Sequence, residues 1–153
     1  MPTSGPRRRS PRQVDAGNEH RDLTRIWLFS SCTAKELRTV TKLITEVTVP
    51  PGTSLAVEGE PAILFFIILT GQATVQHKDR RTATLGPGNY FGELSLLDEK
   101  PRPMSVTSDT EMALLVLRQN HFRKLVYASP RLTRKLLDSM AGRLRAAEAL
   151  LHV

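Results

Sequence analysis

Between Glu46 and Leu117 the chain consists of short runs in which apolar and polar residues alternate. Alternation with a period of two is typical of β-strands that have one face in a core and the other in water. The runs recur about every ten residues and are separated by glycine-containing turns, as in an antiparallel barrel or jelly roll. The expected strands are 47–49, 55–57, 62–69, 73–75, 82–85, 104–107 and 112–117.

Helical patterns precede this region. The segment from Leu23 to Phe29 has a short apolar face at helical spacing, and Thr33 and Glu36 have the spacing of a capping box. The helix that the capping box would open carries apolar residues at helical spacing as far as Ile44. We therefore expect a mainly β fold whose N-terminal helices pack beside the roll.

Two further helical patterns follow the strands. The first is expected over 118–128, and Pro130 suits the first turn of a second, longer helix. The longer helix carries one apolar stripe, made of Leu132, Leu136, Met140, Leu144, Ala147 and Leu151. We expect the first half of this stripe to pack against the roll, and the part after Gly142 to form a lid or a dimerisation segment.

The composition fits one folded domain with a basic tail. Of the 153 residues, 40% are apolar and 24% are charged, which is typical of a globular chain. Residues 1–22 are rich in Pro, Arg, Ser and Gly, so we expect a disordered basic tail, followed by a domain over 23–153. The formal net charge of +7 indicates an anionic partner, although much of the excess lies in the tail and the last helix.

Several function classes lack the residues that they need. The histidines are His20, His77, His121 and His152. They are too dispersed for a metal site, so His77 and His121 are interpreted as surface side chains, and no catalytic triad falls on recognisable turns. The single cysteine, Cys32, cannot form an internal disulfide, and the longest apolar run, 62–69, is too short to span a bilayer. Without a signal peptide pattern, we expect a cytoplasmic protein that is not an enzyme.

The segment from Gly88 to Val106 contains the residues that a sugar phosphate would need. Gly92 has no Cβ, so the backbone can come close to a ligand there. Glu93 begins a run with helical preference, and the first N–H groups of such a helix face outward and attract an anion. Arg102, nine residues after Glu93, offers planar donors that suit a phosphate, while the Glu93 carboxylate suits hydroxyl groups.

The run Phe-Gly-Glu-Leu-Ser-Leu-Leu, which starts at Phe91, and the later Pro-Arg-x-x-Ser-Val resemble the phosphate-binding cassette of cyclic nucleotide-binding domains. These modules occur in catabolite-activator-type regulators, cyclic-nucleotide-dependent kinases and gated channels. The resemblance extends from about Leu28 to Val153. It implies an antiparallel β-roll with N-terminal helices and a C-terminal helical lid, here without a helix-turn-helix pattern for binding DNA.

The resemblance also implies a role for individual residues of the cassette. Glu93 would bind the ribose 2′-hydroxyl, Arg102 the cyclic phosphate, and the Leu94 and Ser95 amides the phosphate oxygens. The threonine that favours cGMP in the family is absent after Arg102, so we expect cAMP rather than cGMP as the ligand.

The cassette departs from the family pattern directly after Arg102. The family usually has Ala, Ser or Thr there, whose N–H also meets the phosphate, whereas Pro103 has no N–H, and Met104 adds bulk. A lost hydrogen bond to a charged group costs about 1.5–3 kcal/mol. Two alternatives therefore stay open: a degenerate module that binds no nucleotide and acts as an interaction scaffold, and an Arg102 that merely pairs with Asp98 or Glu99.

The last helix is the part of the module that we expect to respond to the ligand. By the resemblance, Ala147 and Glu148 occupy the positions at which relatives place hydroxyl groups near the adenine, which makes them lid candidates. We expect ligand binding to reposition this helix and to change contact with an unknown protein partner, with a homodimer through the helix as a further possibility. Nucleic-acid binding by the arginines of the tail is a weaker alternative.

Overall fold

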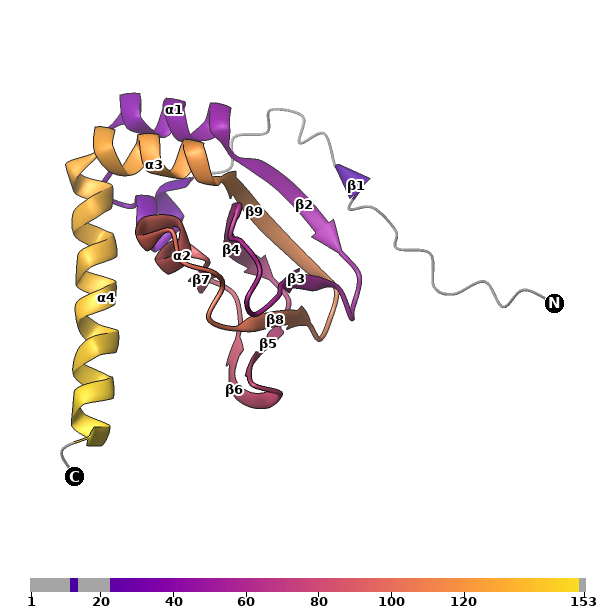
Figure 1. The fold of residues 1–153 in the computed structure, drawn as a ribbon. Coiled ribbons are helices and arrows are strands. Elements are labelled where there is room, and N and C mark those ends of the chain that lie inside the picture. Colours follow the sequence, from indigo (N-terminus) through magenta and orange to yellow (C-terminus); the bar gives the residue numbers. More distant parts are fainter. Residues whose placement is uncertain (1–11, 14–22, 152–153) are drawn as a thin grey trace.

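The computed structural model describes residues 12–13 and 23–151, which form two β-sheets with flanking helices (Figure 1). The strands are β1 (Arg12–Gln13), β2 (Thr45–Val49), β3 (Ser54–Ala56), β4 (Leu64–Thr70), β5 (Ala73–His77), β6 (Arg80–Leu85), β7 (Tyr90–Phe91), β8 (Ser105–Ser108) and β9 (Met112–Arg118). The helices are η1 (Leu23–Arg25), η2 (Trp27–Phe29), α1 (Ala34–Leu43), α2 (Glu93–Asp98), α3 (Gln119–Ala128) and α4 (Pro130–Leu151), where η denotes a 3₁₀ turn.

Every strand pair in the two sheets is antiparallel. One sheet has the strand order β1-β2-β9-β4-β7, and the other has the order β3-β8-β5-β6. Strands that are distant in the sequence, such as β2 and β9 or β3 and β8, are neighbours, so the chain rolls up on itself rather than forming successive hairpins. The predicted antiparallel β-roll with flanking helices is confirmed.

Strand β4 is apolar on both faces because it is covered on both sides. Phe65 and Ile67 face the core that the helices contribute to. Phe66 and Ile68 face the second core, which lies between the two sheets. Since successive strand residues point to opposite faces, a continuous apolar run is what such a doubly covered strand requires.

The helices gather at one side of the roll, and their packing follows the predicted stripes. The capping box of α1 is present, with Glu36 N donating to Thr33 Oγ1 and Thr33 N donating to Glu36 Oε1. On α4, Leu132 and Leu136 are buried, whereas Leu144 is 60% exposed and every residue from Ala141 to Leu150 is exposed. The second half of α4 thus extends past the other helices, as Figure 1 shows.

Some boundaries differ from the sequence prediction. The expected helix over 23–29 is two 3₁₀ turns, and the strand expected from Ala62 begins at Leu64. Strand β7 was not predicted, because two residues are too few to show alternation. Within the expected disordered tail, Arg12 and Gln13 pair with Thr48 and Val47 of β2, and the rest of 1–22 lies outside the described residues.

Candidate functional site

The predicted cassette folds as β7, a single glycine and the short helix α2. Gly92 is the N-cap of α2 and has a φ of +100°, a left-handed conformation that favours glycine. A Cβ on Gly92 would lie 2.6 Å from Arg102 Nη1 and 2.8 Å from the backbone oxygen of Leu64, so there is no room for a side chain. Phe91 stacks on Phe66 of β4, with ring centroids 4.8 Å apart, which fixes the start of the cassette to the sheet.

Arg102 is a buried cation, with only 7% of its surface exposed. Its Nη2 atom donates to the backbone oxygen of Leu64 at 2.6 Å. Burial lowers the pKa of Arg102, and the nearby Glu93 carboxylate partly offsets this, but an arginine keeps its proton at neutral pH in either case. Arg102 forms no ion pair with any carboxylate of the described residues, so its charge is available to an anion from outside the chain.

The alternative partners of Arg102 are engaged elsewhere. Glu99 forms an ion pair with Arg123 at 2.8 Å, and Asp98 accepts a hydrogen bond from the backbone N–H of Lys100 at 3.0 Å. The interpretation of Arg102 as the pairing partner of Asp98 or Glu99 therefore does not describe this fold.

Glu93 is 2% exposed and receives a charged partner from the last helix. Arg143 Nη1 on α4 lies 2.6 Å from Glu93 Oε1, and the Arg143 guanidinium also lies 5.4 Å from the centre of the Tyr90 ring. Burial lowers the pKa of Arg143, but Glu93 and Tyr90 outweigh burial, so the pKa is raised overall. The carboxylate that the sequence assigned to a sugar hydroxyl thus also forms an ion pair with α4.

These groups face one cavity of about 690 Å³. The eight residues that the sequence assigned to the site all line it: Phe91, Gly92, Glu93, Leu94, Ser95, Arg102, Pro103 and Met104. Sheet β3-β8-β5-β6 supplies apolar wall, including Val75 and Val106. A cavity with apolar walls and a few convergent polar groups is typical of a small-molecule site.

The hydroxyl of Ser95 is used within the cassette. It donates to the backbone oxygen of Pro101 at 3.2 Å, which ties α2 to the segment that leads into Arg102. The N–H groups of Leu94 and Ser95 belong to the first turn of α2, where a helix offers them no intrahelical acceptor. The cassette therefore offers a ligand the amide of Ser95 rather than its hydroxyl.

The last helix contributes other residues than those expected. Ala147 and Glu148 are exposed and do not line the cavity, whereas Ser139 and Arg143 of the same helix do. Trp27 of η2 also lines the cavity, with Lys135 Nζ 4.5 Å above its ring. The sequence does not single out these three residues for the site, because neither Trp27 nor α4 adjoins the cassette in the chain and only helix packing brings them to it.

The described part of the chain holds no cluster of three or more His, Cys, Asp or Glu side chains that is arranged to bind a metal ion. His77 is exposed, as expected, but His121 is partly buried on α3. No described helix combines the length and the apolar character needed to cross a membrane.

Comparisons of sequence and of structure with known proteins identify one and the same family. The family model described as the cyclic nucleotide-binding domain matches residues 46–129, more than half of the chain. A "CRP-like cAMP-activated global transcriptional regulator" of Mycobacterium tuberculosis is 29% identical over 128 residues, which are 80% of this chain and 57% of that protein. A "cAMP-dependent protein kinase regulatory subunit" of Yarrowia lipolytica is 32% identical over 106 residues, which are 68% of this chain and 28% of that protein.

Among solved structures, the catabolite activator protein of Thermus thermophilus superimposes with a TM-score of 0.72 at 28% identity. The match covers 81% of this chain and 61% of that protein. The chain thus spans less than two thirds of the length of these relatives. The similarity concerns one module of larger proteins.

Proposed function

The chain belongs to the cyclic nucleotide-binding domain family, and we propose that it binds cAMP in the cavity that Glu93 and Arg102 face. The observation that carries this proposal is the buried Arg102 guanidinium, which faces a cavity of about 690 Å³ and has no carboxylate partner among the described residues. A buried charge without an ion-pair partner is costly, and an anionic ligand would supply that partner.

The phosphate and the ribose of a cyclic nucleotide each have suitable partners in the cassette. The cyclic phosphate would accept from Arg102 and from the first amides of α2, which carry the positive end of the helix dipole. A ribose hydroxyl would donate to Glu93. Two observations favour cAMP over cGMP. The two relatives are a cAMP-activated regulator and a cAMP-dependent kinase subunit, and no threonine follows Arg102.

Signalling would pass through Glu93 to the last helix. Because Arg143 holds the same carboxylate that the ribose would use, bound nucleotide and docked α4 share Glu93. Ligand binding would then shift the population of docked and undocked α4, and a protein partner would read the change. This is a regulatory role without catalysis.

The alternative is a module that binds no nucleotide and acts as an interaction or dimerisation scaffold. Two observations favour it: Pro103 offers no N–H, and the exposed half of α4 carries unpaired leucines. Leucines there with more than half of their surface exposed are Leu144, Leu150 and Leu151, and Leu137 in the first half of the helix is similarly exposed. An apolar stripe of this kind suits a second helix as its partner.

Isothermal titration calorimetry of the full chain with cAMP, and then with cGMP, separates the two functions. Heat at micromolar or lower concentration of cAMP, with weaker heat for cGMP, is the expected result. No heat with either nucleotide at millimolar concentration would overturn the binding proposal and leave the scaffold. Sedimentation analysis of the same sample then measures whether the exposed half of α4 joins two copies.

A further inference from the structure

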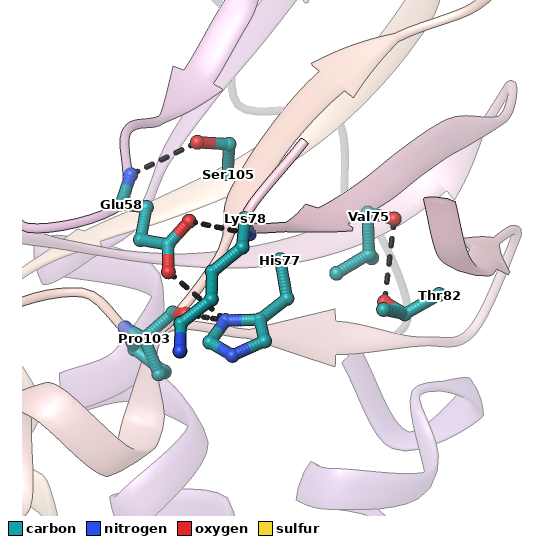
Figure 2. A network of polar contacts seen from close by, with 7 residues as sticks. All are labelled: Glu58, Val75, His77, Lys78, Thr82, Pro103 and Ser105. Atoms are coloured by element: carbon teal, nitrogen blue, oxygen red, sulfur yellow. Dashed lines mark hydrogen bonds and ion pairs between the residues drawn. The ribbon is translucent and has the colours of Figure 1, made fainter. Parts of the chain in front are cut away.

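The ring of His77, at the end of β5, lies against the loop that follows Arg102 (Figure 2). Its Nδ1 atom is 3.0 Å from the backbone oxygen of Pro103 and 2.9 Å from Glu58 Oε1. A carbonyl oxygen and an ionised carboxylate oxygen can only accept hydrogen bonds. Nδ1 therefore carries a hydrogen, and the two oxygens share it.

Glu58, which contacts the ring, is itself bound to the turn of the hairpin and to strand β8. Its Oε2 atom accepts from the backbone N–H of Lys78 at 2.9 Å, and its own N–H donates to Ser105 Oγ at 2.9 Å. Lys78 and Asp79 have φ values of 49° and 63°, so the tip of the β5–β6 hairpin is a tight turn with both central residues in left-handed conformation. The loop after β3, the hairpin tip and the segment before β8 are thereby joined (Figure 2).

A bulge in the hairpin sets the direction of its tip. Val75 pairs with Ala83 and Gln76 pairs with Arg81, so Thr82 is an extra residue in β6. The Thr82 hydroxyl donates to the backbone oxygen of Val75 at 3.3 Å, as Figure 2 shows. A bulge bends the strand that contains it and can change the direction of a side chain. Here the part of the hairpin beyond the bulge places His77 beside Pro103.

Hydrogen bonds hold the backbone at Arg102 and at the residue before it, where the Ser95 hydroxyl donates to the Pro101 oxygen. Arg102 N donates to the oxygen of Glu60, and Gly59 N donates to the oxygen of Arg102, both at 2.9 Å. The next residue, Pro103, has no N–H, so its carbonyl is the only backbone group through which a hydrogen bond can hold it. His77 supplies that bond.

We propose that His77 is a positioning residue for the anion-binding end of the cavity: its shared Nδ1 hydrogen holds the Pro103 carbonyl and so fixes the loop that presents Arg102. The proposal rests on the proposed cyclic nucleotide binding and adds a determinant outside the cassette. The side chains of His77 and Glu58 are 46% and 32% exposed, so the contact contributes as a partly solvated hydrogen bond does. Its loss corresponds to about two- to tenfold in affinity.

Two substitutions of the full chain separate the hydrogen bond from the ring. His77→Leu removes the donor but still fills the space with an apolar side chain. His77→Asn places an amide N–H close to the position of Nδ1. Gln76→Leu, at an exposed neighbour on the same strand, is the control. The first measurement is the cAMP affinity by calorimetry, and the second is amide hydrogen exchange of Arg102 and Gly59 by NMR without nucleotide.

We expect His77→Leu to weaken cAMP binding about two- to tenfold and to speed exchange of both amides by a similar factor. His77→Asn and Gln76→Leu should keep wild-type values in both measurements. Equal loss in His77→Leu and His77→Asn, or unchanged affinity or exchange in His77→Leu, would overturn the positioning role. If the wild-type chain binds no cAMP, the proposed function fails, and the exchange measurement still decides whether His77 holds the Arg102 loop.

Discussion

Arg143 of α4 donates to the buried carboxylate of Glu93 at 2.6 Å, across 50 positions of the chain. Glu93 is the first residue of α2, within the cassette. This bond therefore joins the proposed ligand site to the helix that we propose moves when the ligand binds. The Arg143 side chain is 51% exposed and the Glu93 side chain 2%, which places one end of the bond in the cavity wall and the other near solvent. Under the proposed function, a ribose hydroxyl would compete with Arg143 for this carboxylate.

Replacing Arg143 with alanine should destabilise the protein and uncouple α4 from the ligand. Glu93 would remain buried without its charged partner, so we expect the free energy of unfolding to fall by about 1–3 kcal/mol in urea denaturation. Hydrogen exchange of α4 amides beyond Gly142 should then no longer respond to cAMP. Arg145→Ala, at an exposed position two residues away, is the control and should show neither effect. Persistent response of α4 to cAMP in Arg143→Ala would contradict the coupling.

Replacing Arg102 with lysine should weaken nucleotide binding although the positive charge is kept. The planar fork of the guanidinium binds Leu64 O and faces the cavity, and a single ammonium group cannot reproduce both roles. We expect a loss of about ten- to hundredfold in cAMP affinity by calorimetry, and a larger loss for Arg102→Ala. Wild-type affinity in Arg102→Ala would place the ligand elsewhere.

Replacing Pro103 with alanine should strengthen nucleotide binding. The substitution restores a backbone N–H beside the phosphate position and leaves the carbonyl that His77 holds. One hydrogen bond to a charged group is worth about 1.5–3 kcal/mol, so calorimetry should report a gain of about ten- to hundredfold. Pro51→Ala, at an exposed turn residue, is the matched control. Unchanged affinity in Pro103→Ala would show that the missing donor does not limit binding.

Alanine at two glycines should have opposite effects on stability. At Gly92 a Cβ would meet Arg102 Nη1 and the backbone of Leu64, and the φ of +100° is unfavourable for alanine, so we expect a loss of at least about 1–3 kcal/mol and weakened cAMP binding. At Gly142, inside α4, a Cβ meets no atom, so Gly142→Ala should stabilise the protein by about 0.5–1 kcal/mol. Thermal unfolding measures both. Equal stability of the two variants would contradict the role of Gly92.

Local patterns of the sequence predicted the elements that carry the site. The roll, the capping box of α1 and the helix after Gly92 depend on neighbouring residues, through alternation, capping and conformational preference, and the structure confirms them. The cassette could be placed in one cavity for the same reason, since its members lie within 14 positions of the chain. The specific roles of Glu93 and Arg102 toward a ligand stay predictions.

The contacts made by distant segments could not be predicted from the sequence. On the sequence, Arg143 is one of several arginines on the polar face of α4, and His77 is a surface histidine in a hairpin. Which of these meets Glu93 or Pro103 depends on the docking angle of α4 and on the bulge at Thr82, and both result from packing across the whole fold.

The sequence by itself thus determined the roll and the chemistry of the cassette, because strand alternation and helix capping act between residues that are close in the chain. Only the tertiary structure decided that Arg143 meets the carboxylate of Glu93 and that His77 meets the carbonyl of Pro103. Side chains far apart in the chain meet only when the core has fixed the relative positions of the elements that carry them.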